Sequence, residues 1–240
     1  LSIRRQRQMC IRDRFRGTLS RQLSMRLQKL NVTTTVNDTP ESITAAFQAY
    51  LKACEARRAK RLASFTANSP EIVFTKFRTL RPSFFAYTEG ASDARAECNY
   101  IAGGTLSKIK MNGIWAEEET LMTDEDGVYR DPNLHFDGQH LLFSWKKSAK
   151  EDDFHLYEMD LKTRDIKQLT FGKGHADIEG IYLPDENILF NSTRCGSAVD
   201  CWFTEVSNMY LCDREGRYMR QVGFDQVHTV TPTLLSLIHI

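Results

Sequence analysis

Several features that mark large functional classes are missing from this 240-residue chain. It contains no run of about 18 apolar residues, so the sequence predicts no membrane-spanning helix. Its formal net charge is only +1, which excludes a protein that is basic throughout and binds nucleic acid over its whole surface. With 41% hydrophobic and 26% charged residues, the composition excludes a disordered or collagen-like chain and predicts a globular fold.

The common signatures of catalytic and cofactor sites are missing as well. The six Cys provide no C-x-x-C-H for c-type haem, and the six His provide no H-E-x-x-H or other standard metal spacing. G-x-S-x-G, G-x-x-x-x-G-K and G-x-G-x-x-G do not occur either. We therefore expect no catalytic residue, no metal and no cofactor within this segment, and the sequence leaves open whether the whole protein is an enzyme.

The two ends of the chain differ from the rest. Residues 1–30 carry eight Arg and Lys29 against the single acid Asp13, a net charge of +8, which leaves −7 for the other 210 residues. Residues 1–14 and 236–240 resemble translated sequencing-adapter read-through, and we expect an artefact or a disordered tail at each end. The alternative for the Arg-rich start is an arm for nucleic acid or anionic lipid. We expect the chain to be a fragment whose signal region is not included.

Residues 15–70 are predicted to form a helical lead segment. Between Thr39 and Leu62 the apolar residues fall on one helical face. Thr39 is placed to cap this helix, with Pro40 at its first position. A second, weaker helix is predicted over residues 17–30.

Residues 71–235 contain an internal repeat of short strands. Residues 136–144 match 183–191 at an offset of 47, and residues 156–160 match 209–213 at an offset of 53. An earlier half-copy fits at an offset of 48, and residues 232–234 echo 132–134 and open a third copy. Each copy has four strands in about 50 residues, which is typical of a propeller blade. The sequence therefore predicts a mostly β fold, a partial β-propeller of two to three four-stranded blades after the helical segment.

The repeat resembles a known family. The pattern "Phe-Asp-Gly-x-x-Leu-Leu-Phe … Leu-Tyr-x-Met-Asp … Gln-Leu-Thr" is similar to the TolB-like, WD-type propeller repeat. A closer resemblance, over residues 71–235, is to the middle propeller domain of the hydrazine synthase alpha subunit family. It rests on the strings RDPNLHFDGQHLLFSWKKSAKEDDFHLYEMDL, QLTFGKGHADIEGIYLP, ILFNSTRCGSAVDCWFTEVSNMYLCD and FDQVHT.

This resemblance implies a periplasmic or secreted binding or scaffolding module whose partners are other domains or subunits of the same protein. A small ligand at the channel face is a further expectation, whereas nucleic acid is not. The first alternative is the propeller of a c-type haem oxidoreductase whose redox site lies outside this segment. The second is the propeller of a prolyl-oligopeptidase-like hydrolase.

Propeller ligands usually bind at the central channel, where the innermost strands begin. The repeat alignment places five polar residues at those strand starts: Arg130, Asp131, Asp177, Glu179 and His228. They either hydrogen-bond the loops of adjacent blades or form a polar ring around a ligand. His175-x-Asp177-x-Glu179 could place three metal ligands on one strand face.

Three further interpretations concern the blades. Cys195 and Cys201 are predicted to form a disulfide across a six-residue insertion, with plain loop residues or a contact to metal or haem as the alternatives. Trp145 and Trp202 are assigned to the core between blades, and the charged run 146–153 to a solvated loop. Because so few blades cannot close a propeller, we expect the fragment to self-associate or to be poorly soluble.

Overall fold

The computed structural model describes residues 19–68, 71–78, 99–199 and 204–235. The chain forms two compact units. One consists of Leu1–Glu71 with Lys110–Glu117, and the other of Ile72–Ile109 with Glu118–Ile240. The second unit contains the repeat.

The first unit is mainly helical. Residues 19–29 are helical, and α2 spans Pro40–Asn68. The backbone N–H of Ser42 donates to Oγ1 of Thr39 (3.3 Å), which confirms the predicted cap. The helix continues six residues beyond the predicted end at Leu62, because its sequence holds no Gly or Pro after Pro40 to interrupt it. No helix in the described part of the chain is long and apolar enough to cross a membrane.

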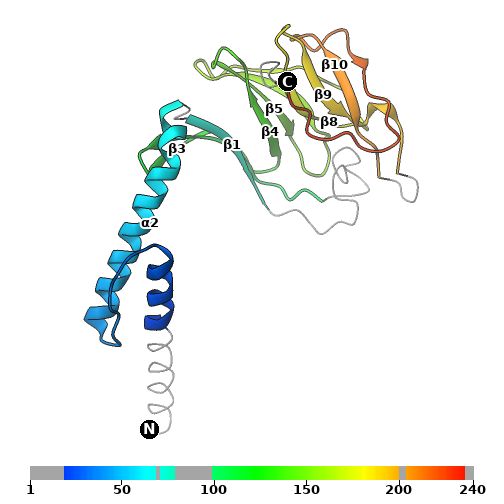
Figure 1. Cartoon of the computed structure of the whole chain (residues 1–240). Helices are drawn as coiled ribbons and strands as arrows, with labels where there is room; N and C mark the ends of the chain where they lie inside the picture. The colour runs from blue at the N-terminus through cyan, green and yellow to red at the C-terminus, as the bar shows by residue number, and fades with distance from the viewer. Residues whose placement is uncertain (1–18, 69–70, 79–98, 200–203, 236–240) are drawn as a thin grey trace. The chain divides into compact units, whose positions relative to one another are not determined.

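Among the described residues eleven strands follow in three sheets, and in each sheet the strands neighbour one another in chain order. β1, β2 and β3 form a three-stranded sheet; we name the sheet β4-β5-β6-β7 the first blade and the sheet β8-β9-β10-β11 the second blade (Figure 1). Both blades are antiparallel throughout. These are propeller blades, and the predicted fold class is confirmed. The strands are β1 (Glu71–Phe77), β2 (Gly104–Asn112), β3 (Trp115–Asp124), β4 (Val128–Leu134), β5 (His140–Lys146), β6 (His155–Asp160), β7 (Ile166–Gln168), β8 (Asp177–Tyr182), β9 (Ile188–Ser192), β10 (Asn208–Cys212) and β11 (Arg220–Gln221).

The strand register shows that the two blades are true repeats. In the first blade Phe143 pairs with Tyr157 across β5 and β6. In the second blade Phe190 pairs with Tyr210 across β9 and β10, at the predicted offsets of 47 and 53. The same offsets relate the other β5–β6 and β9–β10 pairs, so the pairing is shared along these strands. The six-residue insertion therefore lies between β9 and β10 and leaves the sheet itself unchanged.

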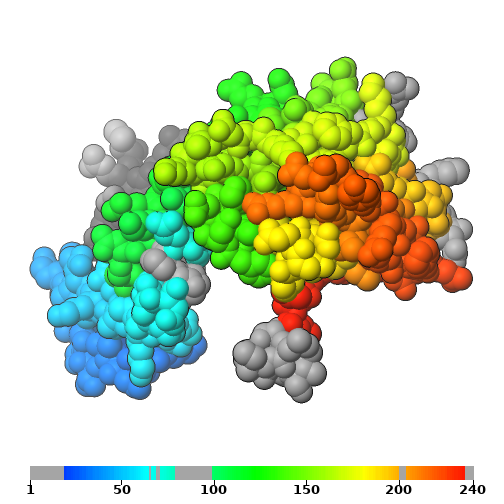
Figure 2. All heavy atoms as spheres, turned by 90° about the horizontal axis from the view of Figure 1, so that it is seen from above, coloured from blue at the N-terminus to red at the C-terminus, as the bar shows by residue number. Residues whose placement is uncertain are grey.

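Both faces of β5 are buried, as predicted for the second strand of a blade. Leu141 and Phe143 pack with Leu106 of β2 and with partly buried residues of β1 and β3. Leu142 points to the opposite face and packs with Ile188 and with other residues of the second blade. A strand packed on both sides needs apolar residues at successive positions, which explains the solid run Leu-Leu-Phe. Figure 2 shows the green, yellow and orange residues of the two blades packed against one another on the face in view.

The charged run 146–153 is only partly the solvated loop that the sequence predicts. Lys146 is fully buried, and its Nζ lies 5.9 Å from the ring centre of Phe154. Asp153 is buried too, and its carboxylate accepts a hydrogen bond from the N–H of Gly174 (2.8 Å). The expectation was wrong at these two residues. Lys146 is the last residue of the buried strand β5, and Asp153 is buried where it accepts the hydrogen bond from Gly174. Within the run, Lys147, Lys150 and Glu151 are exposed, and the residues between them are partly or fully buried.

The two Trp residues assigned to the core have different outcomes. Trp145 is half-buried, packs against the cluster around Phe143, and donates its indole N–H to Asp124 Oδ2 (2.8 Å). It thus lies at the boundary between the first blade and the end of β3. Trp202 lies outside the described residues.

Candidate functional site

The innermost strand of each blade carries the same irregularity. The pairing of β4 with β5 shifts between Arg130 and Asn133, and that of β8 with β9 shifts between Ile178 and Ile181. Inside each bulge lies an acidic residue with positive φ, Asp131 at 55° and Glu179 at 56°. Thr231 in the third copy has a φ of 45°. A non-Gly residue with positive φ thus recurs at three equivalent positions, which indicates that this backbone conformation belongs to the repeat.

These bulges are connected to one another by hydrogen bonds. The Asp131 carboxylate accepts the backbone N–H of Glu179 (3.1 Å). The Glu179 carboxylate in turn accepts the backbone N–H of Thr231 (2.6 Å). Each acidic side chain therefore satisfies the backbone of the next copy, and we call Asp131, Glu179 and Thr231 the bulge ladder.

Arg130 holds the first step of the bulge ladder together. Its Nε donates to Asp131 Oδ2 (2.6 Å), and its Nη1 donates to the hydroxyl of Tyr100 (2.8 Å). Its Nη2 lies 3.6 Å from Glu179 Oε1, so one guanidinium bridges both carboxylates. Burial opposes the charge of this guanidinium, but Tyr100 and Asp131 outweigh it and raise the pKa of Arg130.

The carboxylates of Asp131 and Glu179 lie in a largely buried environment and not in a polar ring that is open to solvent. Only 7% of the Glu179 side chain is exposed, and it also accepts from Asn191 Nδ2 (2.8 Å). Burial raises the pKa of Asp131, while the neighbouring Arg130 acts in the opposite direction. The two carboxylates therefore interact with groups of the protein itself, namely backbone N–H groups and one Arg.

Asp177 lies in a separate cluster, two residues before Glu179. Its Oδ1 accepts from Ser192 Oγ (2.6 Å) and from Arg194 Nε (2.9 Å), and its Oδ2 accepts from Arg194 Nη2 (2.7 Å). His155 Nδ1 lies 3.4 Å from the same Oδ2. The bulge at Glu179 breaks the strand alternation, so the three side chains of His175-x-Asp177-x-Glu179 do not converge, and their interpretation as a metal site was wrong.

His228 lies on the segment that leads into the third copy. Its Nδ1 accepts the backbone N–H of Ser207 (3.2 Å), and partial burial lowers its pKa. The next residue, Thr229, donates its hydroxyl to Asn191 Oδ1 (2.9 Å). The structure therefore brings Arg130, Asp131 and Glu179 together and places Asp177 and His228 elsewhere, and the ligand role of all five stays a prediction.

The predicted disulfide also stays a prediction. The Sγ of Cys195 lies 3.1 Å from the carbonyl oxygen of Val206. Its predicted partner Cys201 lies outside the described residues.

A separate hollow lies within the helical unit, between residues 19–30 and α2. Its volume is about 620 Å³. Cationic side chains dominate its lining: Arg26, Lys29, Arg57, Arg58 and Arg61. The guanidinium of Arg26 lies 5.9 Å from the ring centre of Tyr50. None of the described residues that line this hollow is acidic.

Comparisons with known proteins find similarity among solved structures. No family model and no curated protein matches the sequence. Among solved structures, a putative TolB from Agrobacterium tumefaciens is 17% identical with a TM-score of 0.37, over 52% of this chain and 43% of that one. TolB from Acinetobacter baumannii is 20% identical with a TM-score of 0.33, over 50% and 29%. A puromycin-hydrolyzing peptidase from Mycobacterium tuberculosis is 9% identical with a TM-score of 0.41, over 66% and 21%. The chain thus spans less than half the length of each.

Sequence reasoning missed three members of the ladder region: Tyr100, Asn191 and Thr231. Thr231 was within reach, because the repeat alignment pairs Pro232 with Pro132 and therefore Thr231 with Asp131. Tyr100 and Asn191 gave no such signal, since their roles depend on side-chain contacts between distant segments.

We predict that Glu179→Ala speeds hydrogen exchange at the Thr231 amide by about tenfold or more, because that amide loses its acceptor. Hydrogen–deuterium exchange with mass spectrometry measures it. Glu179→Gln is the matched control, because it keeps a carbonyl oxygen at the same place and should preserve most of the protection. Equal exchange in wild type and Glu179→Ala would show that the ladder bond does not protect the amide.

Proposed function

We propose that this chain supplies consecutive blades of a larger propeller that acts as a binding or scaffolding module. The observation that carries the proposal is the bulge ladder, in which Asp131 binds the backbone of Glu179 and Glu179 binds that of Thr231. Thr231 already belongs to a third copy, so the ladder points toward a further blade. We propose that the rest of the same polypeptide supplies that blade.

The far face of the second blade supports this proposal. In the first blade Leu142 and Leu156 are fully buried, because the second blade covers them. The equivalent residues of the second blade, Leu189 and Met209, are only partly buried. The same strand position is therefore covered in one blade and partly open in the next, as expected where another blade packs.

The charge pattern favours scaffolding over ligand capture at the channel. Arg130, the strongest candidate for an anionic ligand, contacts Tyr100, Asp131 and Glu179 within the protein. A ligand would have to compete with these bonds. We therefore propose that the bulge ladder positions the blades relative to one another. Binding of a small ligand at the channel face is the second hypothesis.

The finer assignment is also a proposal. The strings around Asp131, Asp177 and Cys195 support a relationship to the hydrazine synthase alpha subunit family and an extracytoplasmic location. Reading the complete coding sequence tests it. A C-x-x-C-H beyond the blades would favour a c-type haem oxidoreductase, and a G-x-S-x-G would favour a hydrolase. Blades alone would favour a scaffold.

We predict that the 240-residue chain self-associates at tens of micromolar. Leu189→Lys should shift it toward monomer, because a charge on the partly open face of the second blade opposes apolar packing. Sedimentation velocity measures the distribution. Tyr218→Lys is the control, since Tyr218 is 83% exposed in a turn of the second blade and should change nothing. A wild-type chain that is monomeric and melts sharply would contradict the proposal.

A further inference from the structure

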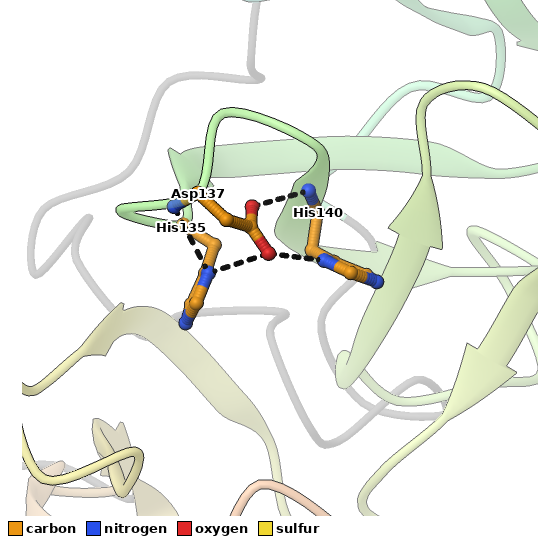
Figure 3. Close-up of side chains that lie close together, drawn as sticks. All are labelled: His135, Asp137 and His140. Carbon is orange, nitrogen blue, oxygen red and sulfur yellow. Dashed lines mark hydrogen bonds and ion pairs between the residues drawn. The ribbon is translucent and has the colours of Figure 1, made fainter.

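The turn between β4 and β5 gathers three groups that metal ions bind. His135, Asp137 and His140 each offer one ligand atom, and these atoms lie within 4.8 Å of one another. Asp137 Oδ2 lies 2.9 Å from Nδ1 of His135 and 2.6 Å from Nδ1 of His140. Figure 3 shows both rings with Nδ1 toward the shared carboxylate and Nε2 away from it.

The outward nitrogens of both rings also face carboxylates. Nε2 of His135 lies 3.2 Å from Oε2 of Glu186, which belongs to the second blade. Nε2 of His140 lies 4.0 Å from Oδ2 of Asp160. A His that binds a metal usually directs its other nitrogen at a carboxylate or carbonyl, which fixes the tautomer and the ring orientation. Both His of this cluster have that outer partner.

The contacts of His135 hold its ring in place on both sides. The backbone N–H of Asp137 donates to Nδ1 of His135 (3.2 Å), and an ion bound at Nδ1 would replace this hydrogen bond. On the other side of the ring, Nε2 lies 3.2 Å from Oε2 of Glu186, which accepts from Nη1 of Arg214 (3.1 Å). His135 is 6% exposed, so its ring orientation is fixed by its surroundings.

The second blade shows that the turn does not need these His residues. At the equivalent turn, Asp185 accepts the backbone N–H of Asn187 (3.2 Å) and its side-chain amide (2.8 Å). The backbone bonds that close this turn join Leu183 and Asn187, as those of the first blade join His135 and His140, and the turn of the second blade is one residue shorter. The Asp is thus explained by turn formation, whereas the two His residues are not.

We propose that His135, Asp137 and His140 bind a divalent transition-metal ion through two imidazole Nδ1 atoms and one carboxylate oxygen. Two imidazoles favour Zn²⁺, Ni²⁺, Co²⁺ or Cu²⁺ over Mg²⁺ and Ca²⁺, which prefer oxygen ligands. Three protein ligands leave at least one position for water. His140 and Asp137 are 29% and 31% exposed, so an ion reaches the cluster from solvent. Through Glu186 the ion would also link the two blades.

The test is titration of the purified 240-residue chain with Zn²⁺ by calorimetry and with Co²⁺ by visible absorption. The expected result is one ion per chain. His140→Asn, which copies the second blade, should weaken binding by at least about tenfold, and Glu186→Gln should weaken it by about tenfold through the outer partner. His175→Asn, a His outside the cluster, should bind like wild type. Circular dichroism checks that each variant is folded.

Two outcomes would overturn the site. One is a folded wild-type chain that binds neither ion at about 100 µM. The other is equal binding by wild type and His140→Asn. Nitrogen-15 spectra of the imidazoles give an independent readout, since the proposal requires the metal-dependent shift at Nδ1, and a shift at Nε2 would contradict it.

Discussion

Replacing Phe190 with alanine lowers the free energy of unfolding by about 3 to 5 kcal/mol. Phe190 is fully buried in β9, between the two blades, where it packs with Leu142 of the first blade and with Tyr210 of its own. Its ring centre lies 6.0 Å from that of Tyr210. Removing the ring leaves a cavity that the paired strands on both sides cannot close, so the cost lies at the upper end for a core substitution.

Urea denaturation followed by far-UV circular dichroism measures this loss. Phe224→Ala is the matched control, because Phe224 is 77% exposed and its removal should change stability by less than about 0.5 kcal/mol. If both substitutions had the same small effect, Phe190 would not lie in a packed interface, and the stacking of the blades would be refuted with it.

Asp177→Asn is expected to destabilise the fold by about 3 to 5 kcal/mol at neutral pH. Asp177 is fully buried, and its carboxylate accepts hydrogen bonds from Nε and Nη2 of Arg194 and from Oγ of Ser192. The amide cannot accept both guanidinium bonds, so the largely buried Arg194 keeps an incompletely paired charge. Denaturation at pH 7 measures this loss.

The same carboxylate predicts how stability depends on pH. Burial tends to raise the pKa of Asp177, but hydrogen bonds from His155 and Arg194 outweigh it and lower the pKa to about 2. An unfolded chain has an ordinary Asp pKa of about 3.9. The stabilisation is therefore complete above about pH 4 and is lost as the pH falls toward 2, a change of about 2 to 3 kcal/mol.

Stability measured from pH 5 to pH 2 in wild type and Asp177→Asn separates this contribution from those of other acids. The wild-type curve should fall more steeply than that of the variant. Glu151→Gln, at an exposed loop position, should follow the wild-type curve. Parallel curves for wild type and Asp177→Asn would show that this carboxylate does not titrate at the lowered pKa.

The positions of the strands could largely be predicted from the sequence, because they depend on local patterns. The repeated run Leu141–Phe143 and Ile188–Phe190 predicted two equivalent strands, and the structure confirms both with the same register. The turns could be placed as well, since each has an Asp whose side chain binds the following backbone N–H groups.

The candidate sites were only partly readable, because they depend on how strands bend and stack. Regular alternation would have put Asp177 and Glu179 on one face, but the bulge with positive φ at Glu179 directs them to different partners. The link from His135 to Glu186 joins two blades at a separation of 51 residues, which no short motif encodes.

The amino-acid sequence alone thus determined the repeat, the strand order within a blade and the apolar faces, because hydrophobic period and turn chemistry act over a few residues. Only the tertiary structure decided which charges meet. Bulge geometry and the packing of one blade on the next bring Asp131 to Glu179, Arg194 to Asp177 and Glu186 to His135, and these contacts arise only when the blades are stacked.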